Sequence, residues 1–515
     1  MNSRAKKIIS LVLAVVFLFG SGLVQKSLNH DRTALGMTIS EPLQNAPPVL
    51  AFSTQVLGGF RGLISNFLWM RANDLQMNDQ YFEAAQLANW ITDLEPHFAQ
   101  VWVYEGWNMA YNISVKFKDF PDRWRWVRNG IELLRDRGLQ YNPDNTLIYQ
   151  NLAWFYQHKM GANLDDANNY YKTAWAQEMT PFFGPHGTNF DSLVHPETPE
   201  ERTNAYILLH TYKIDPVFAQ QVNTEWGPID WRLPEAHAIY WASVGLQKAK
   251  EHPDKVHPDD LITLRRVIYQ SMMQAFQHGQ IIANPFTHTA ELGPNLPLIP
   301  KVNAAYETEM TEDTNDAPHI ATGHRNFLRN AVYYLYEDNQ MANAKKWYKY
   351  LGDKYPDKYI VDGTTYLPKD LTLDEYCVAR IQGDVKDTSQ VDTTAAVKGM
   401  IMRSYESMAL GDDDRSTGYM LLAHAIWNNY MDKMKKDRTS LARVGLAPFK
   451  DLNQEVLDVI LDPVNGLPFE ARAIIRTQLK MGPEPAVTAA STNAIPGSVQ
   501  FMPTNAPATA TTPRQ

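Results

Sequence analysis

The sequence predicts an all-α protein built from packed helix pairs, with an apolar helix at its N-terminus and a polar tail at its C-terminus. Three observations lead to this prediction. Residues 50–180 show helical periodicity with short polar breaks and almost no strand-like alternation. Small residues and prolines recur along this stretch at similar spacings. An uncharged apolar stretch opens the chain, and a segment rich in Pro, Ala and Thr closes it.

Composition limits the classes to which this chain can belong. Hydrophobic residues make up 44% of the 515 and charged residues 20%, so the chain can bury a core and is not disordered throughout. The mean hydropathy of −0.38 is too polar for a protein with many membrane spans. A pI of about 5.9 gives no basic footprint, so no nucleic-acid partner is expected. The single cysteine, Cys377, excludes an internal disulfide and a zinc site made of several cysteines.

The first 26 residues have the features of a membrane anchor. Arg4, Lys6 and Lys7 precede the 17 uncharged residues Ile8–Val24, a length at the short end for a helical span. We expect an uncleaved transmembrane helix, and a cleaved secretory signal is the alternative. Either way the basic flank predicts a cytoplasmic N-terminus and an extracytoplasmic bulk, which is periplasmic if the source is bacterial.

A linker and a second apolar stretch follow the anchor. Residues 27–48 are polar and contain three prolines, which is typical of a linker. The stretch Val49–Met70 carries one charge, Arg61, but several Gly, Ser, Gln and Asn residues lower its hydrophobicity. We expect it to be a helix of a soluble core, although it could graze or re-enter a bilayer.

The rest of the chain divides by composition. Residues 49–181 are assigned to helical repeats, 182–324 to an irregular middle region, and 325–481 to further helices. In the middle region, 181–233 is rich in Pro and Gly, and 281–325 looks like a long loop with an acidic patch. Two helices are predicted between them, Pro234–Lys250 and Pro258–His278, because each has Pro in its first turn. The later helices are predicted at 325–352, 396–411, 416–436, 450–461 and 468–480. The tail 482–515 is predicted to be disordered, because 19 of its 34 residues are Pro, Ala or Thr.

An internal repeat runs through the first helical region. Its pattern is a bulky residue followed four positions later by Gly or Ala, then a run of small and aromatic residues, and then a proline. The first copy contains Leu68, Ala72, Leu75, Ala84 and Pro96, the second Trp102, Gly106 and Pro143, and the third Tyr149, Leu152, Ala153, Tyr156, Ala167, Tyr171, Ala174 and Pro181. A separate copy fits 325–356. The second copy carries 13 extra residues, which we expect between its helices at 113–125.

These positions resemble the tetratricopeptide-repeat family over about 65–181 and again over about 325–356. The resemblance implies stacked antiparallel helix pairs that form a right-handed superhelix with a concave groove. An irregular all-helical domain with coincidental Ala and Pro spacing is the alternative.

The resemblance also implies which side chains line the groove. The family positions fall on Asn66, Trp69, Asn73, Gln76 and Met77 in the first copy, Gln100, Val103, Trp107, Ala110 and Tyr111 in the second, and Leu147, Gln150, Trp154, Gln157 and His158 in the third. The binding candidates among these are Asn66, Trp69, Asn73, Gln100, Trp107, Tyr111, Gln150, Trp154 and Gln157. Amide side chains and aromatic rings would hold an extended peptide by its backbone and its apolar residues. No Lys/Arg clamp for a terminal carboxylate stands at these positions.

Signatures of catalysis, metal binding or cofactor binding are not recognisable in the sequence, so none is expected. The densest polar segment, 226–241, holds Asp230, Arg232, Glu235 and His237 among aromatic residues. These four could form a polar site, and a carboxylate near a histidine could serve acid–base chemistry. The simpler interpretation is a structural cluster with Asp230 paired to Arg232.

Two functions follow from these features. The first is a membrane-tethered extracytoplasmic protein that scaffolds or binds other proteins and has no catalysis of its own. The alternative is an extracytoplasmic α/α-toroid enzyme that acts on glycans, with 226–241 as its active site. Asp230 paired to Arg232 under a turn would favour the scaffold. Glu235 and His237 in a deep pocket would favour the enzyme.

Overall fold

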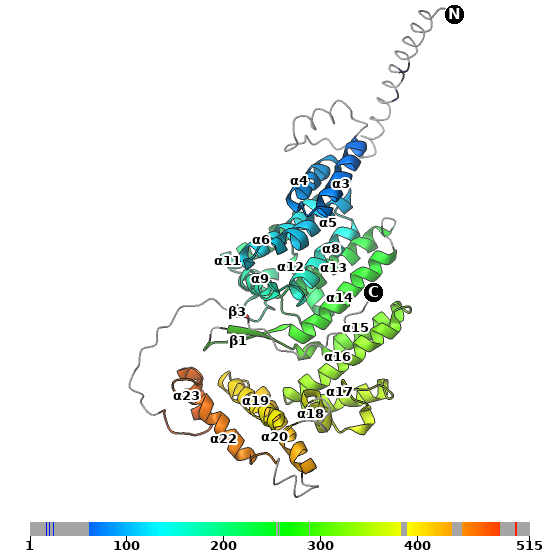
Figure 1. Cartoon of the computed structure of the whole chain (residues 1–515). Helices are drawn as coiled ribbons and strands as arrows, with labels where there is room; N and C mark the ends of the chain where they lie inside the picture. Colours follow the sequence, from blue (N-terminus) through cyan, green and yellow to red (C-terminus); the bar gives the residue numbers. More distant parts are fainter. Residues whose placement is uncertain are drawn as a thin grey trace, which may run out of the picture. The chain divides into compact units, whose positions relative to one another are not determined.

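The structure is a computed structural model of a mostly helical chain that divides into two compact units, residues 1–96 and 97–515 (Figure 1). It describes residues 61–253, 256, 258–287, 289–382, 389–434 and 445–484, together with Phe17, Gly20, Val24 and the strand 500–501. The predicted anchor, apart from those three residues, the predicted linker and most of the predicted tail lie outside this description. None of the described helices is long and apolar enough to cross a membrane.

The first unit contains one antiparallel helix pair, α3 (Arg61–Met77) and α4 (Tyr81–Leu94). Its packing depends on alanines, because Ala72, Ala84 and Ala88 have no exposed surface. Short side chains at these positions let the two helices approach closely. The turn between the helices uses Asp79 in the left-handed backbone region, with a φ of 60°. The pair covers the helical residues assigned to the first copy of the pattern.

The second unit opens with a longer pair whose helices each change to a wide π-helical turn. The first helix comprises α5 (Ala99–Trp107), η2 (Asn108–Ile113) and η3 (Ser114–Lys116), and the second comprises α6 (Phe120–Glu132), η4 (Leu133–Gly138) and α7 (Leu139–Tyr141). Only residues 117–119 connect them. The expected insertion between the helices at 113–125 is therefore wrong, because the extra residues lengthen both helices instead.

Two glycines allow this pair to pack closely. A Cβ atom on Gly130 would lie 2.7 Å from the carbonyl oxygen of Gly106 and 3.3 Å from the Cβ of Ala110. A methyl group does not fit there without a shift of the backbone. Gly106 is the small residue that the repeat pattern places four positions after Trp102.

A third pair follows, in which only the first helix changes to a π-helical turn. Its helices are α8 (Thr146–Trp154) continued by the π-helical η5 (Phe155–Gly161), and α9 (Asn168–Phe183). Tyr149, Leu152 and Tyr171 are buried in its core. The helix α9 does not stop at Pro181, which lies inside its last turn.

The middle region is more regular than its composition suggests. Residues 181–233, predicted to be irregular, contain α10 (Asp191–Val194), α11 (Pro199–His210) and α12 (Pro216–Trp226). The segment 281–325, predicted to be a loop, contains the β-hairpin β1 (Gln280–Asn284) and β2 (Thr289–Gly293), then η7 (Leu296–Leu298) and α15 (Ile299–Glu312). Prolines begin several of these helices, because a first-turn residue needs no hydrogen bond from its amide. The same prolines made both segments look like loops.

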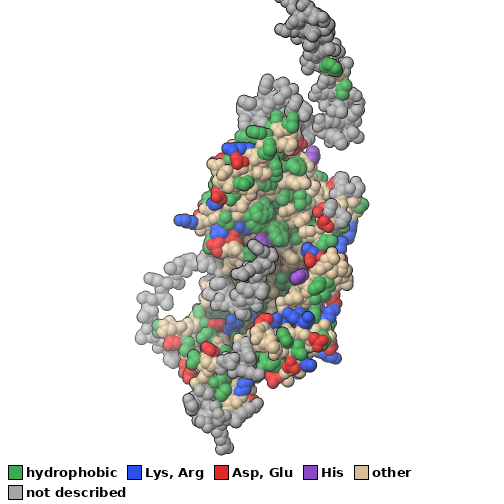
Figure 2. Space-filling model, turned by 45° about the vertical axis from the view of Figure 1, so that its right-hand side comes forward, with side chains coloured by type: hydrophobic (Ala, Val, Ile, Leu, Met, Phe, Trp, Pro, Cys, Tyr) green, Lys and Arg blue, Asp and Glu red, His purple; other side chains and the backbone are tan. Residues whose placement is uncertain are grey.

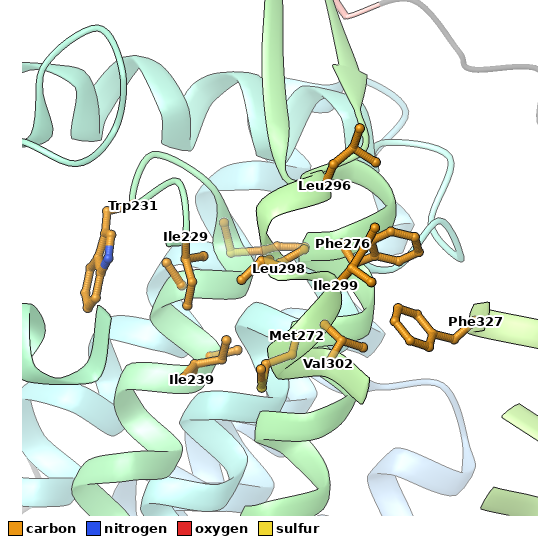
Figure 3. Close-up of a cluster of buried hydrophobic side chains, with 14 of the residues drawn as sticks. Ile229, Trp231, Ile239, Met272, Phe276, Leu296, Leu298, Ile299, Val302 and Phe327 are labelled. Atoms are coloured by element: carbon orange, nitrogen blue, oxygen red, sulfur yellow. The ribbon is translucent and has the colours of Figure 1, made fainter. Parts of the chain in front are cut away.

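Two helices of the middle region form as predicted, α13 (Pro234–Glu251) and α14 (Pro258–His278). They share a hydrophobic core with the segments that follow them (Figure 3). In this core Ile239 of α13, Met272 of α14 and Val302 of α15 lie near one another (Figure 3). The rings of Phe276 and Phe327 meet edge to face at 5.0 Å. Within the second unit, one continuous core joins the helix pairs 99–141 and 146–183 to the C-terminal helices.

The C-terminal part is a series of further helices. They are α16 (Ala317–Glu337), α17 (Met341–Lys354), η8 (Pro368–Asp370), α18 (Leu373–Gln382), α19 (Gln390–Ala409), α20 (Asp413–Met434), α22 (Phe449–Ile460) and α23 (Phe469–Gln478). Their positions agree with the predicted helices at 325–352, 396–411, 416–436, 450–461 and 468–480. Within the predicted tail, β3 (Gln500–Phe501) pairs in parallel with β2, so these two residues have a regular backbone partner.

Candidate binding site

In two successive helix pairs, the α-helical part of the first helix ends at a tryptophan. Trp107 ends α5 and Trp154 ends α8, each five residues after a buried aromatic residue, Trp102 or Tyr149. Five residues correspond to about 500° of helical turn, so each tryptophan points away from its buried counterpart. Trp107 is 40% exposed, whereas Trp102 has no exposed surface.

Each tryptophan stacks on the ring four residues later, and the two stacked pairs are joined. Trp107 and Tyr111 have ring centroids 4.4 Å apart and an interplanar angle of 15°. Trp154 and His158 have the nearly identical values of 4.5 Å and 12°. The Tyr111 Oη lies 3.1 Å from His158 Nδ1. Together Trp107, Tyr111, His158 and Trp154 form a row of rings that we call the aromatic ladder.

The π-helical turns hold the middle of the ladder. Tyr111 lies in η2 and His158 in η5, whereas the two tryptophans lie just before these turns. A π turn is rare in proteins and is frequently found at functional sites, because it departs from the regular hydrogen-bond ladder of the helix. Here it follows the first α-helix in two neighbouring helix pairs and carries the two rings that contact each other.

Charged side chains pack against the Tyr111 ring of the ladder. Lys159 Nζ lies 5.1 Å from the centre of the Tyr111 ring and 2.5 Å from the Asp165 carboxylate. Asp165 also accepts hydrogen bonds from Arg123 at 2.8 Å and from the Ala167 amide at 2.9 Å. Burial opposes the charged form of Asp165, but these hydrogen bonds and cations lower its pKa. Burial lowers the pKa of Lys159, and its hydrogen bond to Asp165 opposes this effect and holds the ammonium group next to the Tyr111 ring.

The ladder itself presents neutral rings. Burial, together with the charge of Lys159, lowers the pKa of His158 below its usual value. At neutral pH the imidazole is therefore uncharged and behaves as a flat aromatic surface. On the face seen in Figure 2, hydrophobic side chains lie among both acidic and basic ones.

The structure distributes the predicted groove residues over both units. Within the first unit, Asn66 and Asn73 are exposed on α3 and Trp69 is half-buried. Within the second unit, Gln100 is exposed and Gln150 is half-buried. These five residues are not members of the ladder.

Four residues at predicted groove positions meet in the ladder, namely Trp107, Tyr111, Trp154 and His158. Gln157 does not line a surface as predicted. It is buried, and its Nε2 donates to the Gln270 side chain at 3.1 Å. The reason is that α14 packs against η5 and covers this side of it. The repeat pattern could not indicate this, because Gln270 stands 113 residues further along the chain.

The second predicted site holds a buried ion pair beneath a turn. Arg232 donates to both carboxylate oxygens of Asp230, at 2.9 and 2.6 Å. The carboxylate lies against Gly187, where a Cβ atom would overlap Asp230 Oδ1. The Trp231 amide donates to the Gly187 carbonyl at 2.9 Å. Asp230 and Arg232 therefore fasten the start of α13 to the Gly184–Gly187 turn.

Glu235 and His237 are buried on different sides of α13. Burial raises the pKa of Glu235, and Lys172 partly offsets this effect. Glu235 Oε1 and Gln274 Oε1 both lie close to Gly161. His237 Nε2 donates to the Trp231 carbonyl at 2.9 Å, and burial lowers its pKa to about 4. Glu235 and His237 are two positions apart in the sequence, so their side chains leave the helix in directions about 200° apart. This carboxylate and imidazole therefore do not form a pair.

Acidic and histidine residues elsewhere are engaged in the fold. Asp313 pairs with Arg266, and Glu307 pairs with Lys354 at 2.9 Å. His324 is buried between Tyr355 and other polar groups. Within the described ranges, no group of three or more His, Cys, Asp or Glu side chains could hold a metal ion.

The ladder offers ring faces to apolar or planar groups. Its hydroxyl, Tyr111 Oη, contacts His158 Nδ1, and burial raises the pKa of Tyr111 above its usual value. Comparisons of the chain with protein-family models, curated proteins and solved structures find no match. The geometry of the ladder is therefore the basis for the function proposed below.

Proposed function

We propose that this chain is a membrane-tethered, tetratricopeptide-repeat-like protein that binds other proteins through the aromatic ladder and has no catalysis of its own. The observation that carries the proposal is the repetition of one stacked pair, Trp107 with Tyr111 and Trp154 with His158. Two successive helix pairs present the same arrangement, and a hydrogen bond joins them. A row of rings made in this way suits an extended ligand.

The expected ligand is an extended segment of a protein with apolar or proline residues. Trp and Tyr rings are frequent anchors of protein interfaces, because they bury a large area with few rotatable bonds. A terminal carboxylate is a poor ligand, since the cation beneath the ladder, Lys159, is paired with Asp165. The ligand should therefore be recognised along its length.

The membrane tether rests on the sequence. The apolar stretch Ile8–Val24 follows basic residues, and the positive-inside rule then assigns the rest of the chain to the extracytoplasmic side. The superhelical arrangement of the repeats likewise rests on the resemblance. This arrangement is supported by three successive helix pairs, at residues 61–94, 99–141 and 146–183.

The glycan-enzyme alternative receives less support. Asp230 is held by Arg232 under a turn, and Glu235 and His237 are buried apart from each other. Both features fit a structural role for the segment 226–241. Stacking of sugar rings on the ladder stays a separate possibility, which the experiment below distinguishes.

The test compares ladder variants with a matched aromatic variant outside the ladder. The rings of Tyr206 and His210 lie 4.2 Å apart with an interplanar angle of 40°, and Tyr206 is exposed on α11, so Tyr206→Ala removes an aromatic pair outside the ladder. Peptides selected from a phage-displayed library on the full chain in detergent are measured for affinity. Trp107→Ala and Trp154→Ala should each weaken binding about tenfold or more, and Tyr206→Ala should not.

The other outcomes of this experiment would contradict the proposal that the ladder binds proteins. Selected peptides that bind all variants equally would contradict a binding role for the ladder. Failure to enrich any peptide would do the same. If instead a glycan array shows binding that depends on Trp107 and Trp154, the ladder is a carbohydrate surface and the protein-binding proposal is wrong.

A further inference from the structure

Three arginines of the C-terminal helices gather around one carboxylate. Arg325 and Arg329 lie one turn apart on α16, and Arg380 lies on α18. Asp362, between α17 and α18, has its Oδ2 atom 2.8 Å from Arg329 Nη2 and 3.6 Å from Arg380 Nη1. The contact with Arg329 lowers the pKa of Asp362 against the effect of burial, and the charges of Arg380 and Arg325 add to this shift. Three positive charges and one negative charge leave these four side chains, which we call the arginine cluster, with a net charge of +2.

The arginine cluster has more hydrogen-bond donors than its neighbours satisfy. Each guanidinium group has five N–H donors. Arg329 donates to the Asn326 side chain at 3.0 Å, and Arg380 donates to the Asn330 side chain at 2.6 Å. The Nε atoms of Arg325, Arg329 and Arg380 are buried and have no hydrogen-bond partner among the described residues. Buried donors without a partner are costly, so the cluster lacks acceptors as well as negative charge.

The Asp362 carboxylate marks the side of the cluster that is open to solvent. Its side chain is 60% exposed, whereas the side chains of Arg329 and Arg380 are 5% and 20% exposed. A turn fixes its position, because Val361 is buried and Gly363 adopts a φ of 72°. One largely exposed carboxylate compensates only part of the charge of nearly buried guanidinium groups.

We propose that the arginine cluster binds a phosphate group at this open side. The inference does not depend on the aromatic ladder. A phosphate monoester carries about two negative charges at neutral pH and three acceptor oxygens, which match the net charge and the surplus of donors. Planar guanidinium groups bind such oxygens in pairs. Because Arg329 and Arg380 already approach a single oxygen of Asp362, both can reach one anionic group.

The Asp362 carboxylate competes with phosphate for the same guanidinium groups. Removing its charge should therefore strengthen phosphate binding, whereas removing an arginine should weaken it. A cluster that is only structural predicts no phosphate binding in either variant. The two substitutions thus give opposite signs if the proposal is correct.

The experiment follows phosphate binding by phosphorus NMR line broadening on the full chain in detergent, at constant ionic strength. The probes are inorganic phosphate and methyl phosphate, and acetate is the competitor. The variants are Asp362→Asn and Arg380→Gln. The control is Arg125→Gln, because the Arg125 side chain is 70% exposed and pairs with Asp122 outside the cluster. Circular dichroism verifies that each variant is folded, and Arg325→Gln replaces Arg380→Gln if that variant is not.

We expect Asp362→Asn to bind phosphate about fivefold more tightly than the wild type, and Arg380→Gln about tenfold more weakly. Arg125→Gln should bind like the wild type. Tighter binding of methyl phosphate would identify the ligand as a phosphate ester, and tighter binding of inorganic phosphate as the free ion.

Three results would overturn the proposal. The first is the absence of saturable binding in both the wild type and Asp362→Asn. The second is equal binding by Asp362→Asn, Arg380→Gln and the wild type, which would place the phosphate elsewhere on the chain. The third is displacement by acetate at equal concentration, which would show a surface that attracts any small anion.

Discussion

The Tyr111 hydroxyl and the His158 imidazole lie 3.1 Å apart, and both residues occupy the same position in two successive helix pairs. Each also receives the stacked ring of a tryptophan four residues earlier. This one contact turns two local pairs into a continuous surface. The predictions below concern how that surface is held and what depends on it.

Removing the Tyr111 hydroxyl should separate the two pairs without removing either stack. Tyr111→Phe keeps the ring but loses the bond to His158, so we expect the free energy of unfolding to fall by about 0.5–1.5 kcal/mol. Urea unfolding measures this change. A variant as stable as the wild type would indicate that the bond contributes nothing to joining the repeats.

The carboxylate of Asp165 should be far more important than that of its neighbour. Asp165→Asn leaves Lys159 and Arg123 with less compensation in a buried position, and we expect a loss of about 3 kcal/mol. Asp166→Asn is the control, because the Asp166 side chain is 74% exposed although it also contacts Arg123. Its loss should stay below about 1 kcal/mol. Equal losses in chemical denaturation would contradict the supporting role of Asp165.

Two glycines in helix interiors should respond oppositely to the same substitution. Gly130→Ala places a methyl group 2.7 Å from the Gly106 carbonyl oxygen, so we expect destabilisation by about 1–3 kcal/mol. A Cβ on Gly399 meets nothing within 4 Å, so Gly399→Ala should stabilise α19 by about 0.5–1 kcal/mol. Thermal melts compare the two. If Gly130→Ala melts like the wild type, the close crossing of α5 and α6 is wrong.

A buried histidine should make stability depend on pH. Burial lowers the pKa of His324 from 6.5 to about 4 in the folded state. The unfolded chain then binds the proton first, so this stabilisation is present above pH 6.5 and is lost as the pH falls toward 4. Glu309 and Glu337, with pKa values raised to about 7, act in the opposite direction over part of this range.

The informative quantity is therefore the difference between the wild type and His324→Gln. Glutamine can still contact Asn303 and Tyr355 but does not titrate. Between pH 7 and pH 4 the wild type should lose on the order of 2–3 kcal/mol more than the variant. Urea midpoints at several pH values provide the measurement. Parallel curves for both proteins would mean that His324 does not titrate from a buried position.

Helix bounds were predictable where a single proline or glycine marks the start or the end of a helix. Pro234 and Pro258 begin α13 and α14, and Gly279 follows the second helix, so their bounds were nearly correct. The same signals failed where prolines are dense. Pro300 lies in the first turn of α15, although its neighbours suggested a loop. Proline density alone does not distinguish a chain of helix starts from a coil.

Of the candidate site, only the two tryptophans that recur at the same spacing were predictable from the sequence. Trp107 and Trp154 stand five residues after a core aromatic, and this regularity is visible in the sequence. The π turns and the Asp165 cluster are not, because both depend on packing between separate helices. The burial of Gln157 depends on α14 in the same way.

The unfolding free energies of three tryptophan variants test the central claim, that the ladder is a surface and not part of the core. Trp102→Ala should cost about 3–5 kcal/mol, because Trp102 is fully buried and stacks on Tyr141 at 5.9 Å. Trp107→Ala and Trp154→Ala should each cost well under half of that. If both ladder variants unfold as readily as Trp102→Ala, their rings belong to the core, and the ladder is not a binding surface.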